Sequence, residues 1–190
     1  MIEPAEEHIL PCDRKTKVSK TMAYLLRHDP EGMEMDGEGF VSLNDLIEKL
    51  EARGFKVDEG YVKDVVQADS KGRYELSGNK IRAVYGHSID VEPSLPVDDS
   101  PDVLYHGTTE KAGRRILAEG LKPRGRQKVH LSSTVEGACD VGRRHCAEPV
   151  ILRIDCEAAA ERGVEIQQAS AEIYVAREIP AEAVERHSLT

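Results

Sequence analysis

The spacing of apolar residues changes about halfway along this chain of 190 residues, and that change constrains the fold more than any other feature. In the first half, apolar residues recur at helical spacing, as Val18, Met22, Leu25 and Leu26 do at i, i+4, i+7 and i+8. In the second half they gather into short runs typical of strands. Residues 90–101, between the halves, are rich in proline and acids, which is typical of a linker. The sequence therefore predicts two lobes of different construction.

The first lobe is expected to contain three helices followed by a β-hairpin. One helix starts at Lys15 and ends before Asp29-Pro30, because a residue that precedes proline avoids the helical conformation. Ser42 and Asp58 have side chains suited to cap the next two helices. The hairpin strands are expected at residues 73–76 and 81–84. Three helices and a hairpin indicate a winged-helix-like lobe.

The second lobe is expected to combine short strands with helices, so the fold class is α+β. Its strands are predicted at residues 103–105, 129–131, 150–154, 164–166 and 173–175. Its helices are predicted at residues 109–119, ended by Gly120, and 134–145, opened by Ser133 and Glu136. The expected organisation is a flexible N-terminus (1–13), a first lobe (14–89), a linker (90–101) and a second lobe (102–190).

The charge of the chain argues against a non-specific nucleic-acid binder. The formal net charge is −9, and proteins that bind nucleic acid without specificity rely on an excess of positive charge. Residues 111–128, however, contain seven basic residues and one acid, Glu119. A local basic run inside an acidic protein favours a specific polyanionic ligand.

The cysteine pattern and the hydropathy exclude several other classes. The four cysteines, at positions 12, 139, 146 and 156, form no CxxC pair, so we expect reduced thiols and no metal site. No run of 18 apolar residues occurs, and the N-terminus lacks the basic start and apolar run of a signal peptide. We therefore expect a cytoplasmic protein with no membrane partner, and a monomer.

Four groups of residues could carry chemistry, and none of them is a glycine-rich nucleotide-binding motif of the Rossmann or P-loop type. They are Leu26-Arg27-His28-Asp29-Pro30, then Lys71-Gly72-Arg73-Tyr74 with Ile81-Arg82-Ala83 and Gly86-His87-Ser88, then Tyr105-His106-Gly107-Thr108-Thr109 with Val129-His130-Leu131-Ser132-Ser133, and finally Val141-Gly142-Arg143-Arg144-His145. Arginine suits bidentate phosphate binding, and a His-Gly-Thr run before a helix suits an anion. Taken singly, each group also has an ordinary structural explanation, such as a charged helix end, a solvated wing or a capped helix.

Taken in order along residues 19–184, these groups resemble the RNA 2′-phosphotransferase family. The matching segments are LLRHDP, GFVSLNDLI, KGRY, IRAVYGHS, LYHGT, VHLSS, VGRRH and AREIP. The resemblance implies a winged-helix lobe joined to an ADP-ribosyltransferase-like lobe that binds NAD⁺. It implies a catalytic set of Arg27, His28, Arg73 and Arg144, with Arg143 competing for the last place. It implies an NAD⁺ site at His106, Gly107, Thr108, His130 and Ser132.

The reaction implied by the resemblance moves an internal 2′-phosphate of RNA, such as that left at a tRNA splice junction, to the ADP-ribose part of NAD⁺. Its products are RNA with a 2′-hydroxyl, nicotinamide and ADP-ribose 1″,2″-cyclic phosphate. A phosphomonoester has a second pKa of about 6, so the attacking 2′-phosphate needs no general base. The arginines are expected to hold the phosphate, and His28 either protonates the departing RNA oxygen or binds phosphate.

Two other functions stay open at the level of sequence. One is an ADP-ribosyltransferase that modifies protein or a terminal phosphate of nucleic acid; it would leave a stable ADP-ribosyl adduct. The other is an RNA-binding protein with a degenerate transferase lobe; it would bind RNA without releasing nicotinamide.

Overall fold

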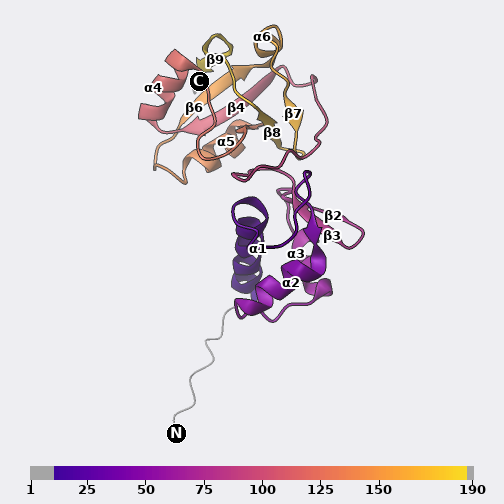
Figure 1. Ribbon diagram of the computed structural model, residues 1–190. Helices are drawn as coiled ribbons and strands as arrows, with labels where there is room; N and C mark the ends of the chain where they lie inside the picture. The colour runs from indigo at the N-terminus through magenta and orange to yellow at the C-terminus, as the bar shows by residue number, and fades with distance from the viewer. Residues whose placement is uncertain (1–10, 188–190) are drawn as a thin grey trace.

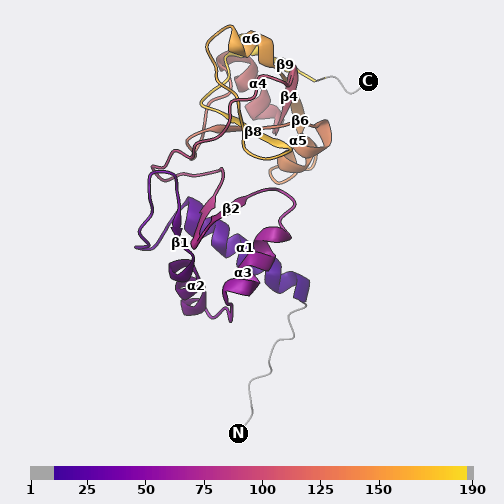
Figure 2. The same cartoon turned by 90° about the vertical axis from the view of Figure 1, so that its right-hand side faces the viewer.

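The computed structural model describes residues 11–187, with side chains from residue 14 onward, and shows one lobe above another (Figure 1). The turned view shows the same separation, bridged by extended chain (Figure 2). Most of the N-terminal segment expected to be flexible, residues 1–10, lies outside the described residues. Within the part described, no helix has the length and apolar character needed to cross a bilayer.

The lower lobe consists of three helices and a small antiparallel sheet. Its elements are α1 (Pro11–Arg27), β1 (Val41–Ser42), α2 (Leu43–Ala52), α3 (Glu59–Gln67), β2 (Tyr74–Ser77) and β3 (Lys80–Ala83), and the strand order is β1-β3-β2. Four apolar side chains predicted from helical spacing are fully buried in one core, namely Val18, Met22, Leu25 and Leu26. The expected three helices and hairpin are therefore confirmed.

The helix starts follow local chemistry. The side chain of Ser42 accepts a hydrogen bond from the Asp45 amide (3.5 Å), and that of Asp58 accepts one from the Tyr61 amide (2.7 Å), as predicted. Helix α1 begins at Pro11 and not at Lys15. Proline is favoured in the first turn, because its missing amide hydrogen would have no partner there.

The upper lobe is built around a six-stranded sheet with order β7-β8-β5-β4-β6-β9, in which every neighbouring pair is antiparallel. Its elements are β4 (Val103–Thr108), α4 (Glu110–Glu119), β5 (Val129–Ser132), α5 (Val135–Gly142), β6 (Val150–Asp155), α6 (Cys156–Ala160), β7 (Gln167–Gln168), β8 (Ile173–Ala176), η1 (Ala181–Ala183) and β9 (Val184–Arg186). Two antiparallel sheets in a mixed chain agree with the predicted α+β class.

Several predicted bounds in the upper lobe were wrong. Residues 164–166 form no strand; the strand comes just after them, as β7. Helix α5 is capped by Thr134, whose Oγ1 accepts from the Gly137 amide (3.1 Å), and not by Ser133, whose amide donates to the Glu172 carbonyl. The same helix ends at Gly142 and not at His145, so Arg143 and Arg144 lie beyond its last turn. Local sequence does not reveal these tertiary contacts.

The two lobes meet along the segment that follows β3. The backbone carbonyl of His87 accepts a hydrogen bond from the Gln127 amide (3.1 Å), and the Gln127 side chain donates to the Ile89 carbonyl (2.7 Å). Farther along, the Gln168 amide donates to the Pro96 carbonyl (2.9 Å). Because α1 runs upward toward this junction (Figure 1), its last residue, Arg27, lies next to the upper lobe.

Gly107 lets β4 lie directly against α5. A Cβ atom built on Gly107 would lie 1.8 Å from the backbone oxygen of Ala138, a distance no real contact allows. The neighbour is backbone in a helix, so it cannot move aside as a flexible side chain would. We therefore expect Gly107→Ala to lower the free energy of unfolding by about 2 kcal/mol or more, measured by urea denaturation.

Gly37 provides the matched control, because a Cβ there meets nothing within 4 Å. Gly37→Ala should leave stability within about 1 kcal/mol of the parent. Equal stability of the Gly107→Ala and Gly37→Ala proteins would show that this close approach is not tight.

Candidate active site

Arg27, at the end of α1, is the most unusual charge in the lobe junction. Its guanidinium lies over the Tyr85 ring, 4.9 Å from the centroid, and its Nε and Nη2 atoms are buried without a hydrogen-bond partner. Burial lowers the pKa of Arg27, and the positive charges of Arg126 and Arg73 lower it further, against the opposing effects of Tyr85 and Tyr74. Buried donors are nearly always paired, so this guanidinium is suited to receive an anion.

His28 follows Arg27 and is exposed. Its Nδ1 is 2.9 Å from the hydroxyl of Ser88, and the Ser88 amide donates to the Arg27 carbonyl (2.9 Å). The start of the connecting segment therefore fixes the imidazole and leaves Nε2 for a ligand. Burial lowers the pKa of His28, and the charges of Arg126 and Arg27 add to that effect.

Arg73 is held by Asp69, which lies four residues before it in the sequence. Its Nε and Nη2 donate to Oδ1 of Asp69 (2.8 and 2.5 Å), and its amide donates to Oδ2 (2.6 Å). The Asp69 side chain is only 3% exposed, so this geometry is fixed before any ligand arrives. Arg73 also lowers the pKa of Arg27, which places it in the same electrostatic cluster.

Arg126 belongs to this cluster as well, although the sequence did not single it out as a site residue. Its charge acts on Arg27, His28 and His130, and its Nη1 is 3.5 Å from Nδ1 of His130. The available signal was the basic run of residues 111–128, of which Arg126 is a member. Only the fold shows that this member faces α1.

Arg143 and Arg144 are placed differently. Both are exposed in the turn after α5, where Arg143 pairs with Asp140 (3.5 Å). Neither is among the charges that shift the pKa of Arg27 or His28. The structure thus brings together Arg27, His28 and Arg73 of the predicted set, with Arg126 beside them, whereas the role of Arg144 stays a prediction.

A second group of predicted residues lies where the pairing between the two central strands of the upper sheet is interrupted, which we call the gap. Strands β4 and β5 pair through Tyr105 and Ser132, whereas β4 and β6 pair over six residues. His106 on β4 and His130 on β5 both lie beyond that single pair. The Nδ1 of His106 donates to the His130 carbonyl (3.0 Å) and so links the two strands there.

The two histidines offer complementary hydrogen bonding. Burial lowers the pKa of His106, so its ring is neutral and, with Nδ1 donating, Nε2 is an acceptor. Burial also lowers the pKa of His130, to about 3, and Arg126 adds to the shift. With Arg126 donating toward its Nδ1, the buried and unpartnered Nε2 of His130 is a donor. The two rings therefore offer one acceptor and one donor.

The other residues predicted to bind NAD⁺ lie on the same two strands. Thr108 ends β4, Ser132 ends β5 and is buried, and Gly107 packs against α5. Ribose hydroxyls and a carboxamide need donors and acceptors together, and the unpartnered Nε2 of His130 provides a donor that the protein itself does not satisfy. The residues present thus fit the nucleotide implied by the sequence.

Comparison with known proteins identifies the family of this chain. The model of the RNA 2′-phosphotransferase, Tpt1/KptA family matches residues 13–178. The chain belongs to the RNA 2′-phosphotransferase family. Among its relatives, the probable RNA 2′-phosphotransferase of Pyrococcus furiosus is 46% identical, over 90% of this chain and 95% of the relative. That of Archaeoglobus fulgidus, probable RNA 2′-phosphotransferase 1, is 41% identical over 95% and 84%, respectively.

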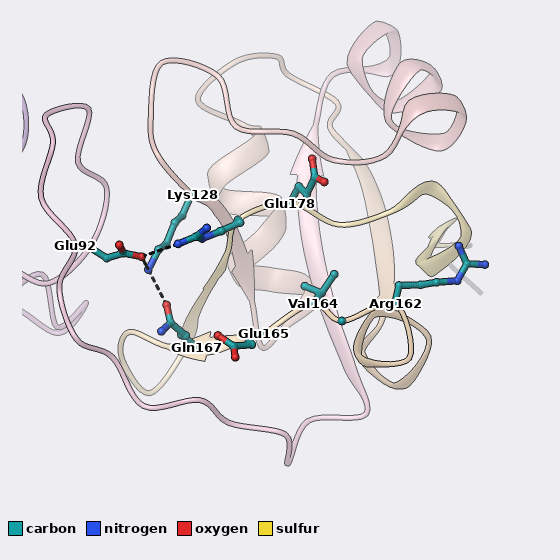
Figure 3. Close-up of a pocket in the computed structure, with 9 residues that line it drawn as sticks. Glu92, Lys128, Arg162, Val164, Glu165, Gln167 and Glu178 are labelled. Carbon is teal, nitrogen blue, oxygen red and sulfur yellow. Dashed lines mark hydrogen bonds and ion pairs between the residues drawn. The ribbon is translucent and has the colours of Figure 1, made fainter.

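A separate pocket of this family member, about 510 Å³ in volume, opens beside the linker (Figure 3). Its polar side chains largely satisfy one another. Lys128 donates to Gln167 (2.7 Å) and lies 4.0 Å from Glu92, which also accepts from Arg177 (3.2 Å). Because these charges are already paired, the pocket fits a polyanion less well than the arginine cluster does.

His87 gives the phosphotransferase a pH-dependent stability. The side chain is 4% exposed, and its Nε2 is buried without a partner. Burial, followed by the charges of Arg27 and His28, lowers its pKa to about 4. An unfolded histidine has a pKa of about 6.5, so between these values the unfolded chain binds the extra proton. The contribution of His87 to folding stability is therefore fully present above about pH 6.5, and it is lost as the pH falls toward 4.

We expect His87→Gln to remove roughly 1 kcal/mol of the stability loss that the parent shows between pH 7.5 and pH 5.5. Urea denaturation at both pH values measures this difference directly. His187→Gln, which replaces a histidine in edge contact with Tyr105 in the upper lobe, provides the control. An unchanged slope in His87→Gln would contradict the assignment of this histidine as neutral and buried.

Proposed function

We propose that this chain transfers an internal 2′-phosphate of RNA to the ADP-ribose part of NAD⁺. The products would be RNA with a 2′-hydroxyl, nicotinamide and ADP-ribose 1″,2″-cyclic phosphate, as needed when tRNA splice junctions are processed. Membership of the RNA 2′-phosphotransferase family supports the phosphate transfer. The arrangement of the site supports the finer statement about the acceptor.

The observation that carries the proposal is the guanidinium of Arg27, whose Nε and Nη2 are buried without a partner beside three further cationic or ionisable groups. A lone arginine at a helix end would reach solvent, whereas Nε and Nη2 of Arg27 are enclosed. Holding that charge near Arg73 and Arg126 is unfavourable without a counter-ion. A phosphate with two negative charges removes the repulsion and offers acceptors to several guanidinium donors.

Each member of the cluster has a distinct task in this proposal. Arg27 and Arg73 come from the lower lobe and hold phosphate oxygens, and Asp69 fixes the orientation of Arg73. Arg126 reaches the phosphate from the upper lobe. His28, fixed through Ser88, presents Nε2 to the phosphate or to the departing RNA oxygen. Preorganised donors of this kind stabilise the charge that develops during phosphate transfer.

The gap between β4 and β5 would hold NAD⁺. When bound, NAD⁺ supplies an ADP-ribose acceptor whose nicotinamide is a leaving group. The Nε2 of His106 would accept from a hydroxyl and the Nε2 of His130 would donate to an oxygen, while Thr108 and Ser132 border the gap. His130 also contacts the edge of Tyr85 (5.7 Å between centroids), the ring under Arg27. Tyr85 would therefore border both the nucleotide site and the phosphate site.

The two lobes divide the work in this proposal. The lower lobe, with three helices and a three-stranded sheet, would be the winged-helix-like part that receives RNA. The upper lobe, with its separated central strands, would be the ADP-ribosyltransferase-like part that receives NAD⁺. The RNA phosphate would enter the junction between them.

An oligoribonucleotide with one internal, radiolabelled 2′-phosphate tests the reaction. With NAD⁺, we expect the label to move to ADP-ribose cyclic phosphate, and without NAD⁺ we expect it to stay on RNA. Arg27→Ala and His28→Ala should each lower the rate roughly 10²- to 10³-fold, since each removes a group that contacts the transferred phosphate.

The fate of the label separates the alternatives. Label that stays on RNA joined to ADP-ribose would favour an ADP-ribosyltransferase. RNA binding without nicotinamide release would favour a binding protein, and either result would overturn the proposal.

Arg126 and Arg144 can be separated by matched substitutions, because both are exposed arginines of the upper lobe. Arg126 acts on Arg27 and His28, so we expect Arg126→Ala to lower kcat roughly 10²-fold or more. Arg144→Ala should lower kcat less, because Arg144 is not among the charges that act on Arg27 or His28. The same RNA assay, under saturating NAD⁺, measures both. A larger loss in Arg144→Ala would instead support the assignment made from the family resemblance.

A further inference from the structure

Tyr24 is the one aromatic side chain of the chain that the fold leaves exposed. The chain has no Trp, two Phe and six Tyr, and all eight rings lie in the described region. Tyr24 is 48% exposed. Every other ring is buried or half-buried, as Tyr74 and Tyr174 are in the two cores. A half-exposed ring offers an apolar face and a hydroxyl on which a ligand can pack.

The position of Tyr24 relates it to the phosphate site. It lies one turn before His28 on α1, and the two ring centroids are 6.0 Å apart at an angle of 50°. The helix runs toward the lobe junction (Figure 1). A strand of RNA whose 2′-phosphate reaches Arg27 and His28 therefore has a neighbouring nucleotide within reach of this ring.

The same face of α1 carries a positive charge farther out. Lys20 is four residues before Tyr24 and is exposed, so Lys20, Tyr24 and His28 follow each other at steps of about 6 Å along the helix. Within residues 14–187, no carboxylate forms an ion pair with Lys20. A cation, an aromatic ring and an imidazole in one line match the backbone charge and the flat bases of a single strand.

We propose that Tyr24 stacks on a nucleobase next to the 2′-phosphorylated nucleotide and that Lys20 contacts the backbone beyond it. This inference rests on the proposed function, because it supplies the substrate contacts outside the phosphate site. It also gives a physical reason for a substrate that is an RNA strand and not an isolated phosphate. Stacking on an aromatic ring accepts every base, so Tyr24 sets strand affinity and not sequence preference.

Direct binding of RNA tests the stacking contact without requiring turnover. Short fluorescent RNAs with one internal 2′-phosphate are titrated with the full chain, and anisotropy gives Kd. One RNA has all its bases, and two others lack the base on the 5′ or the 3′ side. Tyr24→Ala should raise Kd for the complete RNA about 10- to 100-fold, and Tyr24→Phe should bind like the parent.

The abasic RNAs decide whether a base is the partner. For the RNA that lacks the stacked base, the parent and Tyr24→Ala should bind equally. Tyr61→Ala is the matched control, because Tyr61 lies on α3 beside the first turn of α1, and its Kd should not change. Equal losses for Tyr24→Ala on all three RNAs, or no loss on any, would overturn the stacking contact while leaving the proposed function intact.

Two further readouts keep the interpretations separate. If Tyr24 only stabilises the helix end, Tyr24→Ala will lower the melting temperature without raising Kd, which would overturn the inference. If the parent binds none of the phosphorylated RNAs, the inference and the proposed function fail together. A raised KM for RNA with an unchanged kcat in the label-transfer assay would support the contact.

Discussion

The enclosed guanidinium of Arg27 is the constraint on which the rest of the site depends. It lies over Tyr85, and its Nε and Nη2 have no partner. A buried cation without an anion is costly, so the surrounding structure must hold it in place. The Ser88 amide binds the Arg27 carbonyl, and Gly86 lies close enough that a Cβ would meet the guanidinium at 3.4 Å. These contacts hold in place a guanidinium that is suited to receive an anion.

This constraint also couples the two lobes. Tyr85 supports Arg27 on one side and contacts the His130 ring on the other. The Gln127 amide binds the His87 carbonyl, which fixes the segment between Arg126 and His130 against the lower lobe. A phosphate held by Arg27 would therefore lie at a defined position relative to the gap between β4 and β5. Positioning of two reactants is a large part of what such a site contributes to rate.

The electrostatics of the junction fit a reaction that moves a phosphate and leaves protons largely in place. Burial lowers the pKa values of His87 and His130 to about 4 and about 3, so both rings are neutral near pH 7. They therefore add no charge beside the arginines. His28 is the exposed imidazole next to Arg27, and the cluster otherwise consists of permanent cations balanced at one point by Asp69.

Local sequence determined much of this protein. Helical spacing identified the core of the lower lobe, and Ser42 and Asp58 marked two helix starts. The ordered motifs singled out Arg27, His28 and Arg73 as candidate site residues. Each of these sequence signals depends on side chains that are only a few residues apart. Arg126, Tyr85 and Tyr24 could not be found in this way, because their significance comes from contacts with residues distant in sequence or from exposure. The bounds of α5 and β7 were missed for the same reason, since packing and sheet pairing overrode local preference. The sequence thus specified the chemical groups, and the tertiary structure decided which of them meet.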